Sequence, residues 1–216
     1  MKKHLHADYG FRNIRRMNAT GYREKKLNID EINFVATGDF ADEAKNHCAA
    51  VCATNLSLFA LSQQLGFRPD RVAREMLFQE IHKYEKNGPV FRFAARFKKF
   101  LEAGFAKRRG LLFGSRRVRG ADGICEAIDE GDPCVLLLAN DLFHWHWVLA
   151  VGYRVYQNGE VYLRLADSWQ HRAETFYKPG AGSKLLTARA YRVTSAKAAG
   201  TAGAGARAEA GEKPDP

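Results

Sequence analysis

The sequence lacks any long apolar run, and its few cysteines do not follow the spacing of a disulfide or zinc framework. No stretch approaches the roughly 20 apolar residues of a membrane-spanning helix, and the basic N-terminus lacks the apolar segment of a secretory signal. Cys48 and Cys52 lie one helical turn apart without a second such pair, so neither a disulfide scaffold nor a four-cysteine zinc site is expected. These absences favour a cytoplasmic protein without a membrane span.

Positive charge is in excess: the chain has 34 lysines and arginines and 24 aspartates and glutamates, which gives a net charge of +10. The basic residues concentrate in residues 1–32 and 92–119. A basic surface attracts acidic partners such as nucleic acid, anionic lipid or acidic peptides. We find no zinc finger or RNP-like strand, so nucleic acid is not indicated. The charge is first of all that of a solvated basic surface, which could also bind an acidic partner.

The chain divides into three parts by composition. Residues 1–32 form a basic N-terminal arm with little periodicity, and residues 196–216 form an Ala/Gly-rich tail that we expect to be disordered. Residues 33–195 are long enough for one substantial domain. Because this domain begins with helical patterns and ends with strands, the sequence predicts an α+β fold with an antiparallel sheet.

Within the domain, the pattern predicts helices over 44–66, 70–87, 91–105 and 121–131, and strands over 32–38, 133–139, 146–156, 161–169, 173–178 and 188–193. Gly66 is expected to end the first helix, and Asp70 to cap the second. Asn55 is the polar residue of an otherwise apolar helix, so we expect it to bond to neighbouring backbone. Asn158 and Gly159 indicate a hairpin turn.

Three segments of this framework carry residues that could do chemistry together. Cys48 lies at the start of the apolar helix, where the helix dipole favours the nucleophilic thiolate, with Asn46 as candidate N-cap. His144 and His146 alternate with tryptophans on a predicted strand and should share one face. Asp167 ends the next strand across the hairpin, where a carboxylate could orient a histidine.

Three segments carry a family resemblance. HWVLAVGY resembles the histidine strand of the papain-like cysteine peptidase superfamily, and this match selects His146 as the base. ADSW resembles the Asn-Ser-Trp segment of that superfamily, with Asp167 in the place of the asparagine and Trp169 in that of the shielding tryptophan. NHCAAVCATN, around Cys48, is similar to bacterial relatives of the bacteriocin-processing (double-glycine leader) peptidases.

The resemblance covers residues 33–195 and implies a papain-like fold, in which the nucleophile helix packs on a C-terminal antiparallel sheet. It implies a peptidase without cofactor or metal that acts on a peptide or protein through a Cys48–His146–Asp167 triad, supported by Trp169 and His144. Two departures stand out: Ala49-Ala50 replace Gly-Pro, and no glutamine precedes Cys48 as an oxyanion donor. Asn46 is the candidate for that role, and a slow or inactive relative stays open.

Three other functions remain compatible with the same residues. A transglutaminase-like acyltransferase shares the Cys–His–Asp order and differs in its acceptor. Zinc could be held by His144, His146, Cys48 and Asp167, whose side chains are of the types that suit it. A non-enzymatic binding module could keep the fold and hold an acidic partner on its basic surface.

Overall fold

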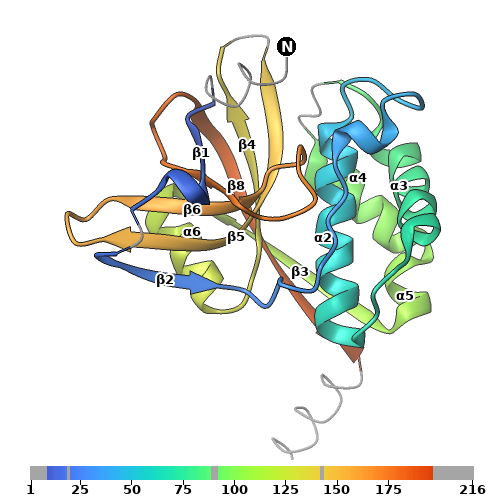
Figure 1. The fold of residues 1–216 in the computed structure, drawn as a ribbon. Coiled ribbons are helices and arrows are strands. Elements are labelled where there is room, and N and C mark those ends of the chain that lie inside the picture. The colour runs from blue at the N-terminus through green and yellow to red at the C-terminus, as the bar shows by residue number, and fades with distance from the viewer. Residues whose placement is uncertain (1–8, 19, 89–91, 142–143, 197–216) are drawn as a thin grey trace, which may run out of the picture.

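The computed structural model describes residues 9–18, 20–88, 92–141 and 144–196. A twisted sheet and a group of helices lie side by side, which confirms the α+β class (Figure 1). The sheet has the order β1-β7-β6-β5-β4-β8-β3, with β2 paired to β5 off this path, and each described pairing is antiparallel.

The strands are β1 Phe11–Asn13, β2 Tyr22–Lys26, β3 Leu111–Val118, β4 Cys134–Ala139, β5 Trp145–Tyr156, β6 Val161–Ala166, β7 Thr175–Tyr177 and β8 Lys184–Ser195. The helices are α2 Cys48–Leu65, α3 Arg71–Glu85, α4 Phe93–Phe100, α5 Ala106–Arg109 and α6 Gly120–Asp129. Short turns of other helix types are η1 Ile14–Arg16, η2 Thr37–Phe40 and η3 Leu101–Phe105.

Helix α2 is the central helix of the core and contacts both β5 and α3 (Figure 1). It begins at Cys48 and ends at Leu65, before Gly66, which was expected to end it and whose φ of 60° is the left-handed conformation common at helix ends. By length and composition α2 could span a membrane, yet 72% of it is buried inside this fold. The helix is apolar on several faces because other parts of the protein pack against those faces.

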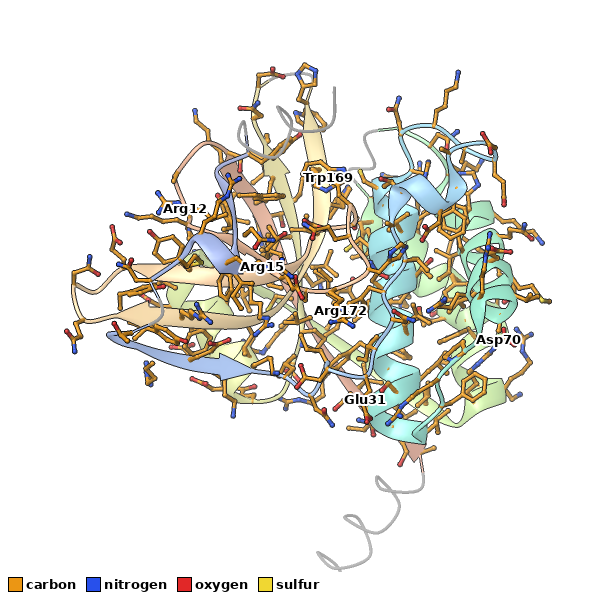
Figure 2. The ribbon with its side chains drawn as sticks, viewed as in Figure 1. Arg12, Arg15, Glu31, Asp70, Trp169 and Arg172 are labelled. Atoms are coloured by element: carbon orange, nitrogen blue, oxygen red, sulfur yellow. The ribbon has the colours of Figure 1, made fainter. Side chains whose placement is uncertain are left out.

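Asp70 caps α3 as predicted, because its side chain accepts a hydrogen bond from the backbone N–H of Ala73 at 2.8 Å (Figure 2). The third helix departs from the prediction over 91–105. It begins at Phe93, widens into the π-helical turn η3 after Phe100, and contains Gly104 at a φ of 119°. A single glycine that leaves helical geometry thus divides the apolar pattern into α4, η3 and α5.

The strand predicted over 32–38 does not form. The side chain of Asn55 in α2 instead pairs with both backbone polar groups of Val35, accepting from its N–H at 2.8 Å and donating to its carbonyl at 3.1 Å. Phe34 N–H donates to His171 O at 3.1 Å. The backbone polar groups of Val35 and the N–H of Phe34 are therefore hydrogen-bonded without a strand partner. The expectation that Asn55 bonds to neighbouring backbone is confirmed.

Part of the expected N-terminal arm belongs to the sheet. Within 1–32, β1 pairs with β7 and β2 pairs with β5. Glu24 of β2 anchors this pairing, because its carboxylate binds Arg154 and Arg164, both at 2.8 Å. These short polar strands carry little apolar alternation, so the sequence pattern missed them. Residues 1–8 of the arm and 197–216 of the tail lie outside the described residues.

Candidate active site

Cys48, the first residue of α2, opens onto a cavity of about 310 Å³ between the N-terminal end of the helix and the sheet. The cavity is lined by Thr37, Asn46, His47, Cys48, Gly88, Trp145, His146, Trp147 and Trp169. The structure therefore brings together five of the residues singled out from the sequence. Four of them line the cavity: Cys48, His146, Trp169 and Asn46. The fifth, Asp167, lies behind the wall and is bonded to His146.

The N-cap of α2 is His47, and the expectation that Asn46 caps the helix is wrong. Asn46 has a φ of 53°, a left-handed conformation that asparagine tolerates but that does not suit an N-cap. Its carbonyl accepts a hydrogen bond from Gly88 N–H at 2.9 Å, and its side chain is exposed at the rim of the cavity. Asn46 thereby ties the α3–α4 connection to the site.

His47 supports the wall of the cavity. Its Nε2 bonds to the carbonyl of Thr37 at 3.1 Å, and its ring packs against Phe40 and Phe78. Burial lowers the pKa of His47 from 6.5, so the ring is neutral near pH 7. With Nε2 donating to Thr37, this histidine is placed to hold backbone in position.

The Cys48 thiol is protonated at rest. Burial raises its pKa above 9.0, although hydrogen bonds from the backbone at Trp147, Ala49 and Cys48 itself act in the opposite direction. The thiolate expected from the helix dipole is therefore not the resting form, because desolvation outweighs the first-turn N–H groups. The bond to Trp147 also places the sulfur beside the residue that follows His146. A base that takes this proton would accordingly be needed for the thiol to act as a nucleophile.

The other three cysteines are less suited to reaction. Burial raises the pKa of Cys52 well above its ordinary value, that of Cys125 to about 11 and that of Cys134 to about 12. None of them lines the cavity that Cys48 opens onto. Cys48 is therefore the cysteine that a reagent in this cavity would meet.

His146 is buried on β5, where a hydrogen bond and a ring stack hold its imidazole. Its Nε2 donates to the main-chain carbonyl of Asp167 at 2.7 Å. Its ring stacks on Trp169, with centroids 4.1 Å apart and planes 9° from parallel, and Trp169 lies between the sheet and the N-terminal end of α2 (Figure 2). Because a carbonyl can only accept, this bond fixes the proton on Nε2 and leaves the lone pair of the neutral ring on Nδ1.

The Asp167 carboxylate organises the turn after β6. Its Oδ1 accepts from the backbone N–H groups of Trp169 at 2.9 Å and Gln170 at 3.0 Å. Its Oδ2 accepts from Thr175 Oγ1 at 2.6 Å and Gln170 Nε2 at 3.3 Å. These bonds hold in place the carbonyl that meets His146 and the tryptophan that stacks on it, so the carboxylate acts on the histidine through the turn.

His144 does not share a strand face with His146, as the sequence alternation had suggested. Strand β5 begins at Trp145, and His144 lies in the preceding turn, where its Nδ1 bonds to Asp141 Oδ2 at 2.6 Å and its N–H to Asp141 Oδ1 at 2.8 Å. The described residues contain no group of three or more His, Cys, Asp or Glu side chains placed to hold a metal ion. The donor geometry thus offers no support for the zinc alternative.

Sequence reasoning missed Thr37 and Gly88 as residues of the cavity. Thr37 falls in the segment 32–38 that the pattern predicted as a strand, and it reaches the site through a bond from its N–H to Ser168 O at 2.8 Å. Ser168 itself has a φ of 62°, a conformation unusual for serine. Such contacts between distant segments leave no periodic signal in the chain.

Comparison with known proteins shows a likeness of fold. No family model matches the chain, and no curated protein matches it. A crystal structure from Bacillus anthracis, described as a candidate C39-like peptidase, superposes with a TM-score of 0.51 at 10% identity, over 79% of this chain and 98% of that one. The chain therefore has the α+β fold of a C39-like, papain-like peptidase. The likeness does not extend to the bacteriocin-processing family.

Proposed function

We propose that the protein is a cysteine peptidase in which Cys48 is the nucleophile and His146 the base. The observation that carries this proposal is that Cys48 and His146 line one cavity, with His146 bonded to Asp167 and stacked on Trp169. A nucleophile, a base and a group that orients the base are the parts of an acyl-transfer site. The fold of a C39-like peptidase supports a peptide or protein as substrate.

In the proposed reaction, Nδ1 of His146 takes the proton of the Cys48 thiol while the sulfur attacks the carbonyl carbon of an amide. The carbonyl electron pair moves to oxygen, and the backbone N–H of Cys48 donates to this oxyanion, with Asn46 as the side-chain donor indicated by the sequence. The pair then returns, and the imidazolium protonates the departing amine. Water, deprotonated by His146, releases the acid from the thioester.

Because the Cys48 thiol is protonated at rest, His146 acts in this proposal as a general base. Because burial raises the pKa of the thiol, a preformed thiolate–imidazolium pair is not required, and the proton moves as the bond forms. Asp167 supports the proposal as a positioning residue, since its carbonyl accepts from Nε2. A relationship to bacterial relatives of the bacteriocin-processing peptidases and a cytoplasmic location remain parts of this proposal.

The test is selective alkylation. Native protein is treated with limiting iodoacetamide near pH 7, and the modified cysteine is located by mass spectrometry in the wild type, His146→Ala and His144→Ala. We expect modification at Cys48 in the wild type, a fall of about 10²-fold in rate in His146→Ala, the scale of general-base assistance, and little change in His144→Ala. The last variant is the matched control, because His144 bonds to Asp141 outside the cavity.

Equal reactivity of Cys48 in wild type and His146→Ala would refute the proposed base. That result would favour the second candidate function, an inactive papain-like module that binds an acidic partner. The net charge of +10 and the lack of a glutamine upstream of Cys48 are the observations that favour this second candidate. Its binding should weaken as salt rises and should be indifferent to alkylation of Cys48.

A further inference from the structure

We infer that the hydroxyl of Thr37 is the side-chain donor to the oxyanion, in the place that a glutamine upstream of the nucleophile would otherwise fill. This inference rests on the proposed function and assigns a role within the same site. Thr37 lines the cavity together with Cys48, His146 and Trp169, and it is partly buried. Its hydroxyl forms no hydrogen bond with another of the described residues.

The backbone of Thr37 is fixed to both sides of the site. Its N–H donates to the carbonyl of Ser168 at 2.8 Å, on the turn that carries Asp167 and Trp169. Its carbonyl accepts from Nε2 of His47, the N-cap of the nucleophile helix, at 3.1 Å. The residue thus spans the histidine side and the cysteine side of the cavity. A donor held in this way needs little reorganisation when charge develops nearby.

Several other donors at this cavity are already committed or inaccessible. Trp145 Nε1 donates to Asp141 O at 3.0 Å, and Gly88 N–H donates to Asn46 O at 2.9 Å. Trp147 Nε1 has no hydrogen-bond partner among the described residues, but it is buried out of contact with the cavity space, and its ring stacks on Phe93. These three groups therefore cannot serve an incoming oxyanion without rearrangement.

Asn46 is the competing side-chain donor, and its surroundings differ from those of Thr37. Asn46 is exposed at the rim, whereas Thr37 is partly buried. A hydrogen bond to a developing charge is stronger where water is excluded, because the effective dielectric is lower. The Thr37 hydroxyl, together with the Cys48 backbone N–H, is the pair that the geometry favours.

Two probes separate oxyanion stabilisation from activation of the thiol. Iodoacetamide reacts by displacement of iodide, so a new S–C bond forms without a carbonyl oxyanion. p-Nitrophenyl acetate reacts through a tetrahedral adduct: the Cys48 S–C bond forms, the carbonyl pair moves to oxygen, and its return expels p-nitrophenolate. Water then hydrolyses the acetyl thioester to acetate and regenerates the thiol. The burst of p-nitrophenolate reports acylation, and alkylation reports the thiol alone.

The experiment compares wild type with Thr37→Val, which keeps the branched shape but removes the hydroxyl, and Thr37→Ser, which keeps the hydroxyl. We expect Thr37→Val to slow acylation by about 10²-fold, the scale of one lost oxyanion donor, with alkylation of Cys48 unchanged and Thr37→Ser close to wild type. Asn46→Gly keeps the left-handed backbone and removes the amide, and it should slow acylation less than Thr37→Val does.

Unchanged acylation in Thr37→Val, no rescue in Thr37→Ser, or a larger loss in Asn46→Gly would overturn the assignment. A parallel fall of acylation and alkylation in Thr37→Val would also overturn it, because Thr37 would then act by supporting the structure. These outcomes differ from failure of the proposed function itself. If the proposed function itself fails, Cys48 is alkylated at the same rate in the wild type and in His146→Ala.

Discussion

Two fully buried carboxyl groups of this protein have opposite surroundings. Asp167, beside the candidate site, accepts hydrogen bonds from two backbone N–H groups and from the side chains of Thr175 and Gln170. Glu85, at the end of α3, has no hydrogen-bond partner for either carboxyl oxygen among the described residues. Arg96 approaches Glu85 but donates to its main-chain carbonyl, at 2.7 Å.

The difference shows that a buried carboxyl group stabilises a fold when hydrogen-bond donors surround it and destabilises the fold when they do not. Of the hydrogen bonds described for the Asp167 carboxylate, three come from residues within three positions of it and one from Thr175, so the turn brings most of its own donors. The surroundings of Glu85 come from distant elements and include Cys52 of α2 and Tyr191 of β8, whose buried hydroxyl also lacks a partner within the described residues. Burial raises the pKa of Glu85 from 4.5 to about 8, and Arg96 offsets this only in part.

The largest expected effect comes from removing the Asp167 carboxylate. Asp167→Ala leaves two partly buried backbone N–H groups and the buried Thr175 hydroxyl without their acceptor, so we expect the free energy of unfolding to fall by about 3 kcal/mol. The turn would also release the carbonyl that orients His146, and alkylation of Cys48 should slow accordingly. Urea unfolding and iodoacetamide labelling measure the two effects.

Asp167→Asn is the matched control for this prediction. Its amide oxygen can still accept from Trp169 and Gln170 N–H, and its amide nitrogen can donate to the Thr175 hydroxyl. We therefore expect Asp167→Asn to keep most of the stability and most of the Cys48 reactivity. A loss in Asp167→Asn as large as in Asp167→Ala would instead assign the carboxylate charge a direct role.

The second prediction concerns Glu85 and has the opposite sign. Between pH 4.5 and 8 the unfolded chain ionises Glu85 while the folded protein keeps it protonated, so the free energy of unfolding falls as pH rises through this window. At about 1.4 kcal/mol per pH unit, this amounts to roughly 3 kcal/mol at pH 7. Glu85→Gln removes the ionisation and should be more stable than wild type at pH 7 by that order.

Unfolding curves at several pH values test this. Wild type and Glu85→Gln should have similar stability near pH 4, where the carboxyl is protonated in both states, and should diverge up to about pH 8 and not beyond. A constant difference at all pH values would mean that Glu85 ionises with the same pKa in the folded and the unfolded protein. Near-identical curves throughout would refute the burial argument.

The sequence predicted the elements whose signals are local. Gly66 ends α2, Asp70 caps α3, and the turn at Asn158 and Gly159 joins β5 to β6, because each depends on the conformation of one or two residues. The match of residues 144–169 to the papain-like pattern also placed His146 and Trp169 together, and the structure stacks them.

Features that depend on distant partners could not be predicted in the same way. The segment 32–38 reads as a strand by composition, but Asn55 from α2 takes the place of a strand partner at Val35. The role of Asp167 was expected of its carboxylate, whereas the hydrogen bond to His146 comes from its main-chain carbonyl, which no residue identity reveals. Thr37 joined the site through a backbone bond to Ser168, and sequence spacing carries no trace of it.

The smallest expected effects come from single hydroxyl groups in the same two regions. Thr175→Val removes a donor to Asp167 at 2.6 Å, which should lower the free energy of unfolding by about 1–2 kcal/mol. Tyr191→Phe removes a buried hydroxyl that has no partner among the described residues, and it should leave stability unchanged or raise it by about 1 kcal/mol. Both variants keep side-chain shape nearly constant, so urea unfolding compares the hydroxyl groups alone. Equal losses in the two variants would show that Tyr191 is hydrogen-bonded in solution and that the two regions differ less than their carboxyl groups indicate.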